Sequence, residues 1–133
     1  MVDFLQPKVT DLNRPFWEGT AAGELRLQYC QESNAFRYPI SRVCPICLSP
    51  DYEWRKVSGN GEIYTYMIFR RAYHPSFEGR VPYNVCMIQL DEGPRMFSNV
   101  VDGGVDVKIG QRVRVQFEER PGGIALPVFV LDQ

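Results

Sequence analysis

The sequence has a single histidine, His74, among its 133 residues, and its net charge is −1. One histidine without an evident partner is weak support for acid–base chemistry. A charge near zero gives no general attraction to nucleic acid or to anionic membranes. No apolar run approaches the roughly 18 residues of a membrane span, and the first residues do not resemble a signal peptide. We therefore expect a cytoplasmic protein.

Motifs of catalytic sites are also missing from the sequence. There is no Ser/His/Asp or Cys/His arrangement for nucleophilic catalysis, and no glycine-rich phosphate loop that leads into a helix. Cys86 lies between Val85 and Met87 in an apolar run, which favours a core position over a nucleophile. We therefore predict no catalytic residue, and expect that the chain is not an enzyme on its own.

Three of the four cysteines have the spacing of a zinc ribbon, but the fourth ligand is missing. Cys30, Cys44 and Cys47 are present, and Ser33 stands where the first Cys-x2-Cys knuckle would end. Four thiolates satisfy a tetrahedral zinc ion, whereas a serine hydroxyl stays protonated unless the metal removes its proton. The sequence leaves open a three-thiolate zinc site and a ribbon that keeps its fold without the ion. A redox pair at Cys44 and Cys47 is a third alternative, which no βαβ pattern supports.

The stretch from Gly61 to Asp102 organises the chain. It contains three β-forming runs separated by Gly, Pro, Asn and Asp residues typical of turns. The first two runs carry apolar residues on both faces, so we expect them to be buried on both sides, as in a barrel. Two more runs follow a short turn, and five strands in this order predict an OB-type barrel. The predicted strands are 62–73, 84–91, 95–101, 112–118 and 124–131.

The part before the barrel reads as a helix and a small ribbon. We expect a helix from Asp11 to Gly23, capped by Thr10 or Asp11, and a half-exposed strand from Glu24 to Tyr29. The protein is thus predicted to be mainly β. Its expected parts are an N-terminal helical segment (1–23), a degenerate rubredoxin-like zinc ribbon (24–57) and a five-stranded OB-fold barrel (58–133).

Phe16 and Trp17 lie on the predicted helix, and the sequence supports two roles for them. They either pack against this chain's own barrel or form a partner interface, since aromatic side chains are favoured anchors between proteins.

Several short motifs occur in an order that resembles the family catalogued as domain of unknown function thirty-five. They are Phe-Trp-Glu-Gly at 16–19, Gly-Glu-Leu at 23–25, the cysteine ribbon, Tyr66, Pro-Tyr at 82–83, Leu-Asp-Glu-Gly at 90–93 and Ile-Gly-Gln-Arg-Val at 109–113. The resemblance implies a helix, a zinc ribbon and an OB-fold. It also implies a non-catalytic accessory subunit of a thiolase-fold enzyme that handles acyl-coenzyme A, such as a thiolase, a condensing synthase or a lipid-transfer-like aldolase. Ser33 departs from the usual cysteine of the family.

The loop after the first barrel strand is the expected ligand site. Arginines suit the phosphates of coenzyme A, and an aromatic residue can stack on its adenine or line its pantetheine arm. The candidate residues are Arg70, Arg71, His74, Phe77 and Arg80. An alternative function is the binding of single-stranded nucleic acid, but the acidic isoelectric point of about 5.8 opposes it. This function would use arginines together with tyrosines as stacking platforms, namely Arg70, Arg71, Arg80, Arg112 and Arg114 with Tyr64, Tyr66 and Tyr73.

Overall fold

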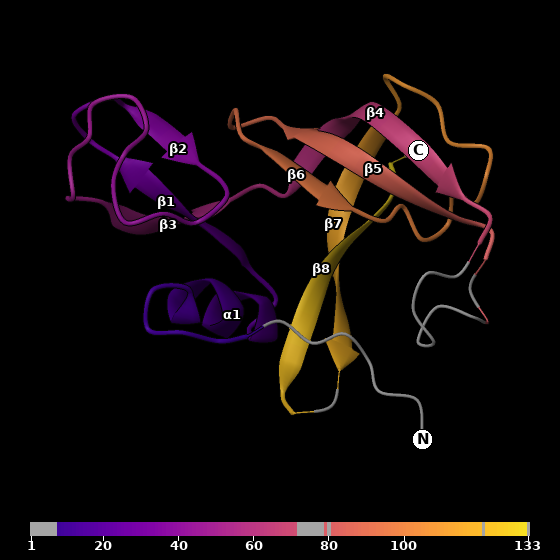
Figure 1. Ribbon diagram of the computed structural model, residues 1–133, viewed down its shortest axis with the longest axis horizontal. Helices are drawn as coiled ribbons and strands as arrows, with labels where there is room; N and C mark the ends of the chain where they lie inside the picture. Colours follow the sequence, from indigo (N-terminus) through magenta and orange to yellow (C-terminus); the bar gives the residue numbers. More distant parts are fainter. Residues whose placement is uncertain (1–7, 72–78, 80, 121, 133) are drawn as a thin grey trace.

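The computed structural model describes residues 8–71, 79, 81–120 and 122–132. In these residues one helix precedes eight strands, and none of the described helices is long and apolar enough to cross a membrane. Figure 1 shows the helix and the ribbon strands beside a curled sheet. The elements are α1 (Arg14–Ala21), β1 (Leu25–Cys30), β2 (Ala35–Arg37), β3 (Glu53–Val57), β4 (Asn60–Phe69), β5 (Tyr83–Leu90), β6 (Arg95–Ser98), β7 (Arg112–Arg120) and β8 (Ile124–Leu131).

Helix α1 is shorter than its sequence pattern predicts. Thr10 N–H donates to Asn13 Oδ1 (2.6 Å), and Asn13 N–H donates to Thr10 Oγ1 (3.3 Å), so a turn forms before the helix. Asn13 is the N-cap, and the expected cap at Thr10 or Asp11 is wrong. Pro15 lies in the first two helical positions, where a missing N–H costs no hydrogen bond. Gly23, at φ 80°, takes the left-handed conformation that often follows a helix.

The ribbon is an antiparallel three-stranded sheet in the order β2-β1-β3. Leu25 and Leu27 are buried, as their alternation predicts. Gln28 was expected on the exposed side, yet it is also fully buried. Its side chain donates to Ser41 O (2.8 Å) and accepts from Ser41 N–H (2.9 Å), which satisfies the amide without water.

The second sheet has the order β6-β5-β4-β7-β8 and confirms the predicted five-stranded OB-fold. It curls until the chain just after β6 meets β8 in a parallel bridge between Val100 and Phe129. Val101 N–H donates to Phe129 O, and Phe129 N–H donates to Asn99 O, each at 2.9 Å. Strand β8 ends the strand order, an edge position that suits Pro127 because proline has no N–H to donate.

Burial of β4 on both faces, expected from its composition, is wrong. Ile63 is fully buried, but Tyr64 is 45% exposed and Met67 is 61% exposed. A β-bulge shifts the register between Ile63 and Thr65. Strand β4 then pairs with β7 only through Asn60–Glu62, and none of the described elements covers Met67 on the outer face of its far half. Packing into the hydrophobic core therefore does not explain why the residues on this face are apolar.

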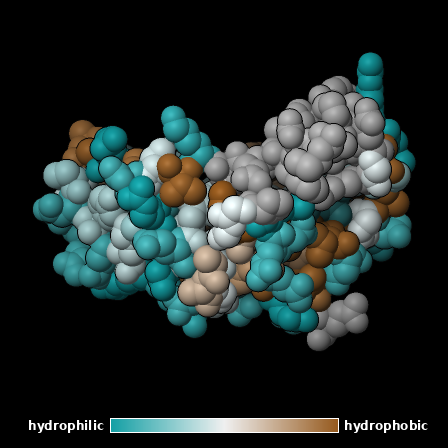
Figure 2. Space-filling view, turned by 90° about the horizontal axis from the view of Figure 1, so that it is seen from below, coloured by the Kyte–Doolittle hydropathy of each residue, from teal (hydrophilic) through white to brown (hydrophobic). Residues whose placement is uncertain are grey.

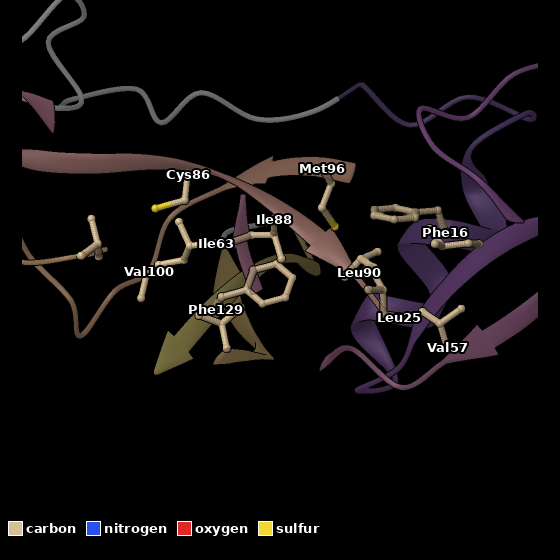
Figure 3. Close-up of a cluster of buried hydrophobic side chains, with 13 residues drawn as sticks. Phe16, Leu25, Val57, Ile63, Cys86, Ile88, Leu90, Met96, Val100 and Phe129 are labelled. Carbon is tan, nitrogen blue, oxygen red and sulfur yellow. The ribbon is translucent and has the colours of Figure 1, made fainter. Parts of the chain in front are cut away.

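One hydrophobic core joins the barrel, the helix and the ribbon. Phe129, Ile88 and Ile63 fill the barrel, and the cluster continues through Leu90 and Met96 (Figure 3). In the same view it reaches the helix and ribbon side chains Phe16, Leu25 and Val57. The helix and the ribbon are therefore packed against the barrel, and α1 lies beside the turn between β7 and β8.

Candidate functional site

The three ribbon cysteines come together at one end of the three-stranded sheet. Cys30 ends β1, while Cys44 and Cys47 belong to the knuckle that follows the loop at Ser41. The three Sγ atoms lie within 4.8 Å of one another, so these residues could hold a metal ion. Cys44 N–H donates to Ser49 O (2.9 Å), and Leu48 N–H donates to Cys44 O (2.8 Å), which closes the knuckle around the thiols.

The oxygen of Ser33 occupies the fourth side of this cluster. Ser33 Oγ lies 3.3 Å from Cys44 Sγ, and Cys30 Sγ lies 3.6 Å from Cys47 Sγ. A tetrahedral zinc ion with bonds of about 2.3 Å to sulfur separates its sulfur ligands by about 3.8 Å. The spacing therefore fits a site with three sulfurs and one oxygen.

The pKa values of the two knuckle thiols, Cys44 and Cys47, are shifted in opposite directions. The hydroxyl of Ser33 and the backbone N–H groups of Cys47 and Ile46 lower the pKa of Cys44 from 9.0 to about 6. The backbone at Ser49 lowers the pKa of Cys47, but desolvation and the neighbouring Cys30 and Cys44 outweigh it and raise that pKa to about 11. A lowered pKa favours the thiolate of Cys44, which is the protonation state that a metal ligand needs.

The knuckle also has a polar neighbour that its cysteine spacing does not reveal. The Cys47 thiol lies 3.8 Å from Glu32 Oε2. Glu32 directly precedes Ser33, the position where the cysteine ligand is missing. A carboxylate at that place in the sequence was the signal that could have identified Glu32 as a neighbour of the site.

A hollow of about 230 Å³ opens between the start of β5 and the adjoining ends of β7 and β8. Pro82 directly precedes β5, while Arg120 ends β7 and Leu126 lies near the start of β8. The wall is largely apolar, while Glu118 and Arg120 form an ion pair within it. Its lining residues are Pro82, Tyr83, Asn84, Asn99, Val100, Val101, Gly104, Glu118, Arg120, Leu126 and Val128.

Asn84 shapes the base of the hollow and was missed as a site residue. Its Nδ2 donates to Val100 O (2.9 Å) and Gly104 O (2.8 Å), and its Oδ1 accepts from Val100 N–H (2.8 Å). These bonds hold the chain after β6 against β5. Asn84 shares the inward alternation of Cys86 and Ile88, so a polar residue in a buried register was the signal that could have found it.

Two of the five predicted loop residues are described by the structure. Arg70 and Arg71 are exposed at the end of β4, where they line a shallow depression with Met67, Ile68 and Phe69. The other three, His74, Phe77 and Arg80, lie outside the described residues. The structure therefore brings the two arginines to the loop end of the barrel, and the loop as a whole stays a prediction.

The two aromatic residues of α1 have different surroundings. Phe16 is only 2% exposed and lies in the core, where its ring centroid is 4.9 Å from that of Trp17 and 6.1 Å from that of Tyr38. Packing against this chain's own barrel is the role that fits Phe16. Trp17 is half-buried, and its Nε1 is buried without a hydrogen-bond partner among the described residues. Trp17 therefore keeps surface that a partner can contact.

Residues that the nucleic-acid alternative requires are engaged elsewhere. Arg112 forms a bidentate pair with Asp91, at 2.9 Å and 2.7 Å. The guanidinium of Arg95 lies 3.8 Å from the ring centroid of Tyr64, which covers one face of a tyrosine needed for base stacking. This arrangement gives no support to a stacking platform for nucleic acid.

Comparisons with known proteins show the family. Residues 54–118 match the family model described as ChsH2, C-terminal OB-fold domain. A DUF35 domain-containing scaffold protein of Pyrococcus furiosus is 32% identical over 96 residues, which are 66% of this chain and 69% of that protein. The chain belongs to the DUF35 family.

Two further relatives show how far the similarity extends. A protein of Thermomonospora curvata named "Probable enoyl-CoA hydratase alpha subunit" is 31% identical over 93% of this DUF35 chain, which spans only 39% of that protein. A solved structure titled "Ltp2-ChsH2(DUF35) aldolase" contains a chain with 30% identity and a TM-score of 0.83. That match covers 95% of this chain and 98% of the other.

Proposed function

We propose that the chain is a non-catalytic accessory subunit of a thiolase-fold enzyme that handles an acyl-coenzyme A. The observation that carries the proposal is the similarity, over nearly the full length of both chains, to the DUF35 chain of the Ltp2-ChsH2(DUF35) aldolase. Similarity to scaffold proteins of the same family supports a structural role. The partner would supply the reacting groups, and this chain would bind or guide the thioester.

The loop end of the barrel is the part that we assign to the thioester. Coenzyme A combines phosphates with a long, weakly polar arm. Arg70 and Arg71 offer exposed guanidinium groups that suit phosphate. The hollow offers an apolar wall around Val101, Leu126 and Val128 with one ion pair, a combination typical of a small-molecule site.

We further propose that zinc is the ion of the ribbon site, held by Cys30, Cys44 and Cys47 with Ser33 or water as the fourth ligand. The spacing of the donor atoms supports this set. Zinc bound there would have a structural role, because it would fasten the knuckle to β1. Occupancy is expected to be incomplete, since a neutral hydroxyl is a weaker ligand than a thiolate.

Reconstitution of the enzyme tests the proposed function. Each thiolase-fold subunit of the source organism would be co-expressed with the tagged chain, and turnover of its acyl-coenzyme A would be measured with and without the chain. A stable complex whose turnover requires this chain is the expected result. Turnover by the purified chain alone, or the absence of a complex with every such subunit, would contradict the proposal.

A further inference from the structure

The outer faces of the barrel strands differ sharply in polarity. On β7 the exposed residues are Arg112, Arg114, Gln116 and Glu119, as expected for the solvent-facing side of an antiparallel sheet. The strands β4, β5 and β6 lie side by side in Figure 1. Their outer face carries a group of apolar side chains, and Glu62, Thr65, Gln89 and Arg95 are the polar residues around it. The view from below shows mostly hydrophilic residues with separate apolar groups (Figure 2), so a continuous apolar area is not general to this surface.

Strand register shows that the apolar side chains form a continuous surface. Met67 on β4 lies opposite Val85 on β5, and Met87 on β5 lies opposite Phe97 on β6. Directly paired residues in an antiparallel sheet project from the same face. Met67 and Phe97 are 61% and 65% exposed, while Val85 and Met87 are half-buried between them. Phe69 and Tyr83 extend the row toward the loop end, with ring centroids 5.2 Å apart.

We propose that this outer apolar face, formed by Met67, Phe69, Tyr83, Val85, Met87 and Phe97, is the surface that docks on the catalytic subunit. The inference rests on the proposed function and names the contact surface on this chain. Met and aromatic residues are enriched at the centres of protein interfaces, with arginine beside them. Among the described residues the hydrophobic core lies on the opposite side of this sheet, and a contiguous apolar surface left exposed is typical of an interaction site.

The charges around the face identify the kind of partner. Arg70 and Arg71 lie at one end of it, and Arg95, beside the ring of Tyr64, lies at the other end with the carboxylate of Glu62. The rim is therefore net basic among the described residues. A partner with an apolar strip flanked by carboxylates would be complementary in both polarity and charge.

A second copy of this chain does not fit the same surface. Two-fold pairing brings identical patches together, so each arginine end would meet an arginine end of the other copy in either orientation. Like charges that face each other across an interface oppose association. The complementary partner is therefore a different protein, and the catalytic subunit is the one that the proposed function requires.

A pair of double variants with a crosslink tests the surface. Met67→Ser with Phe97→Ser removes the two most exposed side chains of the face, and Val105→Ser with Ile109→Ser is the matched control on exposed apolar residues elsewhere. The probe is each thiolase-fold subunit of the source organism, titrated against the full chain. We expect the dissociation constant to rise at least about tenfold for the first pair and less than about twofold for the control.

The outcomes separate the surface from the proposed function. If wild type binds no such subunit, both are overturned. If wild type binds and the Met67/Phe97 variant binds equally well, only the surface is overturned. Where that variant misfolds, replacement of Phe97 by p-benzoylphenylalanine in the full chain decides the matter on illumination. A crosslink to the thiolase-fold subunit supports the inference, whereas a crosslink to a second copy, or none, overturns it.

Discussion

The side chain of Gln28 holds both polar groups of the Ser41 backbone, with its Nε2 at 2.8 Å from Ser41 O and its Oε1 at 2.9 Å from Ser41 N. Arg37 joins this network, since its Nε donates to Gln28 Oε1 (3.2 Å) and its Nη2 donates to Ser41 O (3.0 Å). Gln28 is fully buried on β1, so the loop that leads to the knuckle is fastened to the sheet without a metal ion.

The hydrogen bonds of Gln28 predict that the fold survives removal of metal by a chelator. They also predict that the fold is destabilised when Gln28 is replaced. A chelator should leave a cooperative urea transition in place, because the loop keeps these bonds. Gln28→Ala should lower the free energy of unfolding by about 2 kcal/mol or more, since it leaves buried groups unpaired. Gln31→Ala is the control, because its side chain is exposed. Unfolding of wild type by chelator alone would contradict the prediction.

The side chain at position 33, a serine in place of a cysteine, should determine how much zinc the protein contains. Wild type should contain less than one zinc per chain, whereas Ser33→Cys should bind zinc at least about tenfold more tightly, because a fourth thiolate completes the tetrahedral site. Elemental analysis and competition with a chromophoric chelator measure both quantities. Ser33→Ala is the matched control and should not gain affinity. One tightly held zinc in each wild-type chain would show that the oxygen site is as good as a thiolate site.

The pair of Asp91 and Arg112 predicts a pH dependence of stability. The hydrogen bonds from Arg112, aided by its charge, lower the pKa of Asp91 below its usual value of 3.8. A lowered pKa adds stability above the unfolded-state pKa, and this stability is lost as the pH falls through the folded-state value. Arg112→Gln should therefore shift the urea midpoint at pH 7 more than at pH 3.

Arg114→Gln is the control for that experiment, because Arg114 approaches its carboxylate, Asp132, only to 3.9 Å. Its effect should be smaller than that of Arg112→Gln at pH 7, and it should vary less with pH. Equal shifts for Arg112→Gln at both pH values would mean that the Asp91 pair adds nothing to stability.

The barrel was predictable because its strands are marked by local signals. Gly59, at φ 78°, and the Glu92–Pro94 turn separate runs of β-forming residues, and the order of these runs fixes the OB topology. The exposed face of β4 was not predictable in this way. Met67 and Ile63 have similar hydrophobicity, and only the bulge between Ile63 and Thr65 and the short pairing with β7 decide which of them is buried.

The candidate site was partly predictable for a related reason. Cys30, Cys44 and Cys47 follow a known spacing, so their meeting in space was expected. The roles of Gln28 and Asn84 depend on partners 13 to 20 residues away, at Ser41, Val100 and Gly104. Such long-range hydrogen bonds leave no periodic pattern in the sequence. Asn84 at least is a polar residue in a buried register, whereas Gln28 falls in the register expected to be exposed on its strand.

Phe16 and Trp17 should respond differently to truncation. Phe16→Ala should lower the free energy of unfolding by about 3–5 kcal/mol, because the ring is buried in the core. Trp17→Ala should weaken binding to the catalytic subunit by about 2 kcal/mol if that residue anchors the interface, with a smaller loss of stability. Urea denaturation and titration with the catalytic subunit measure the two effects. An unchanged affinity for Trp17→Ala would assign this residue to packing alone.

The ligand loop predicts an effect on substrate affinity without loss of the complex. Replacement of Arg71, Phe77 and Arg80 together by alanine should raise the apparent KM of the partner enzyme for its acyl-coenzyme A, because the phosphates lose charged donors and the arm loses an aromatic contact. The complex should still assemble, since Met67, Met87 and Phe97 of the docking face are unchanged. A control with Arg42, Arg114 and Ile109 replaced by alanine removes two arginines and one apolar residue at exposed positions elsewhere. If the loop variant assembles and turns over substrate like wild type, the loop does not lie on the substrate path, and the barrel serves the enzyme only as a scaffold.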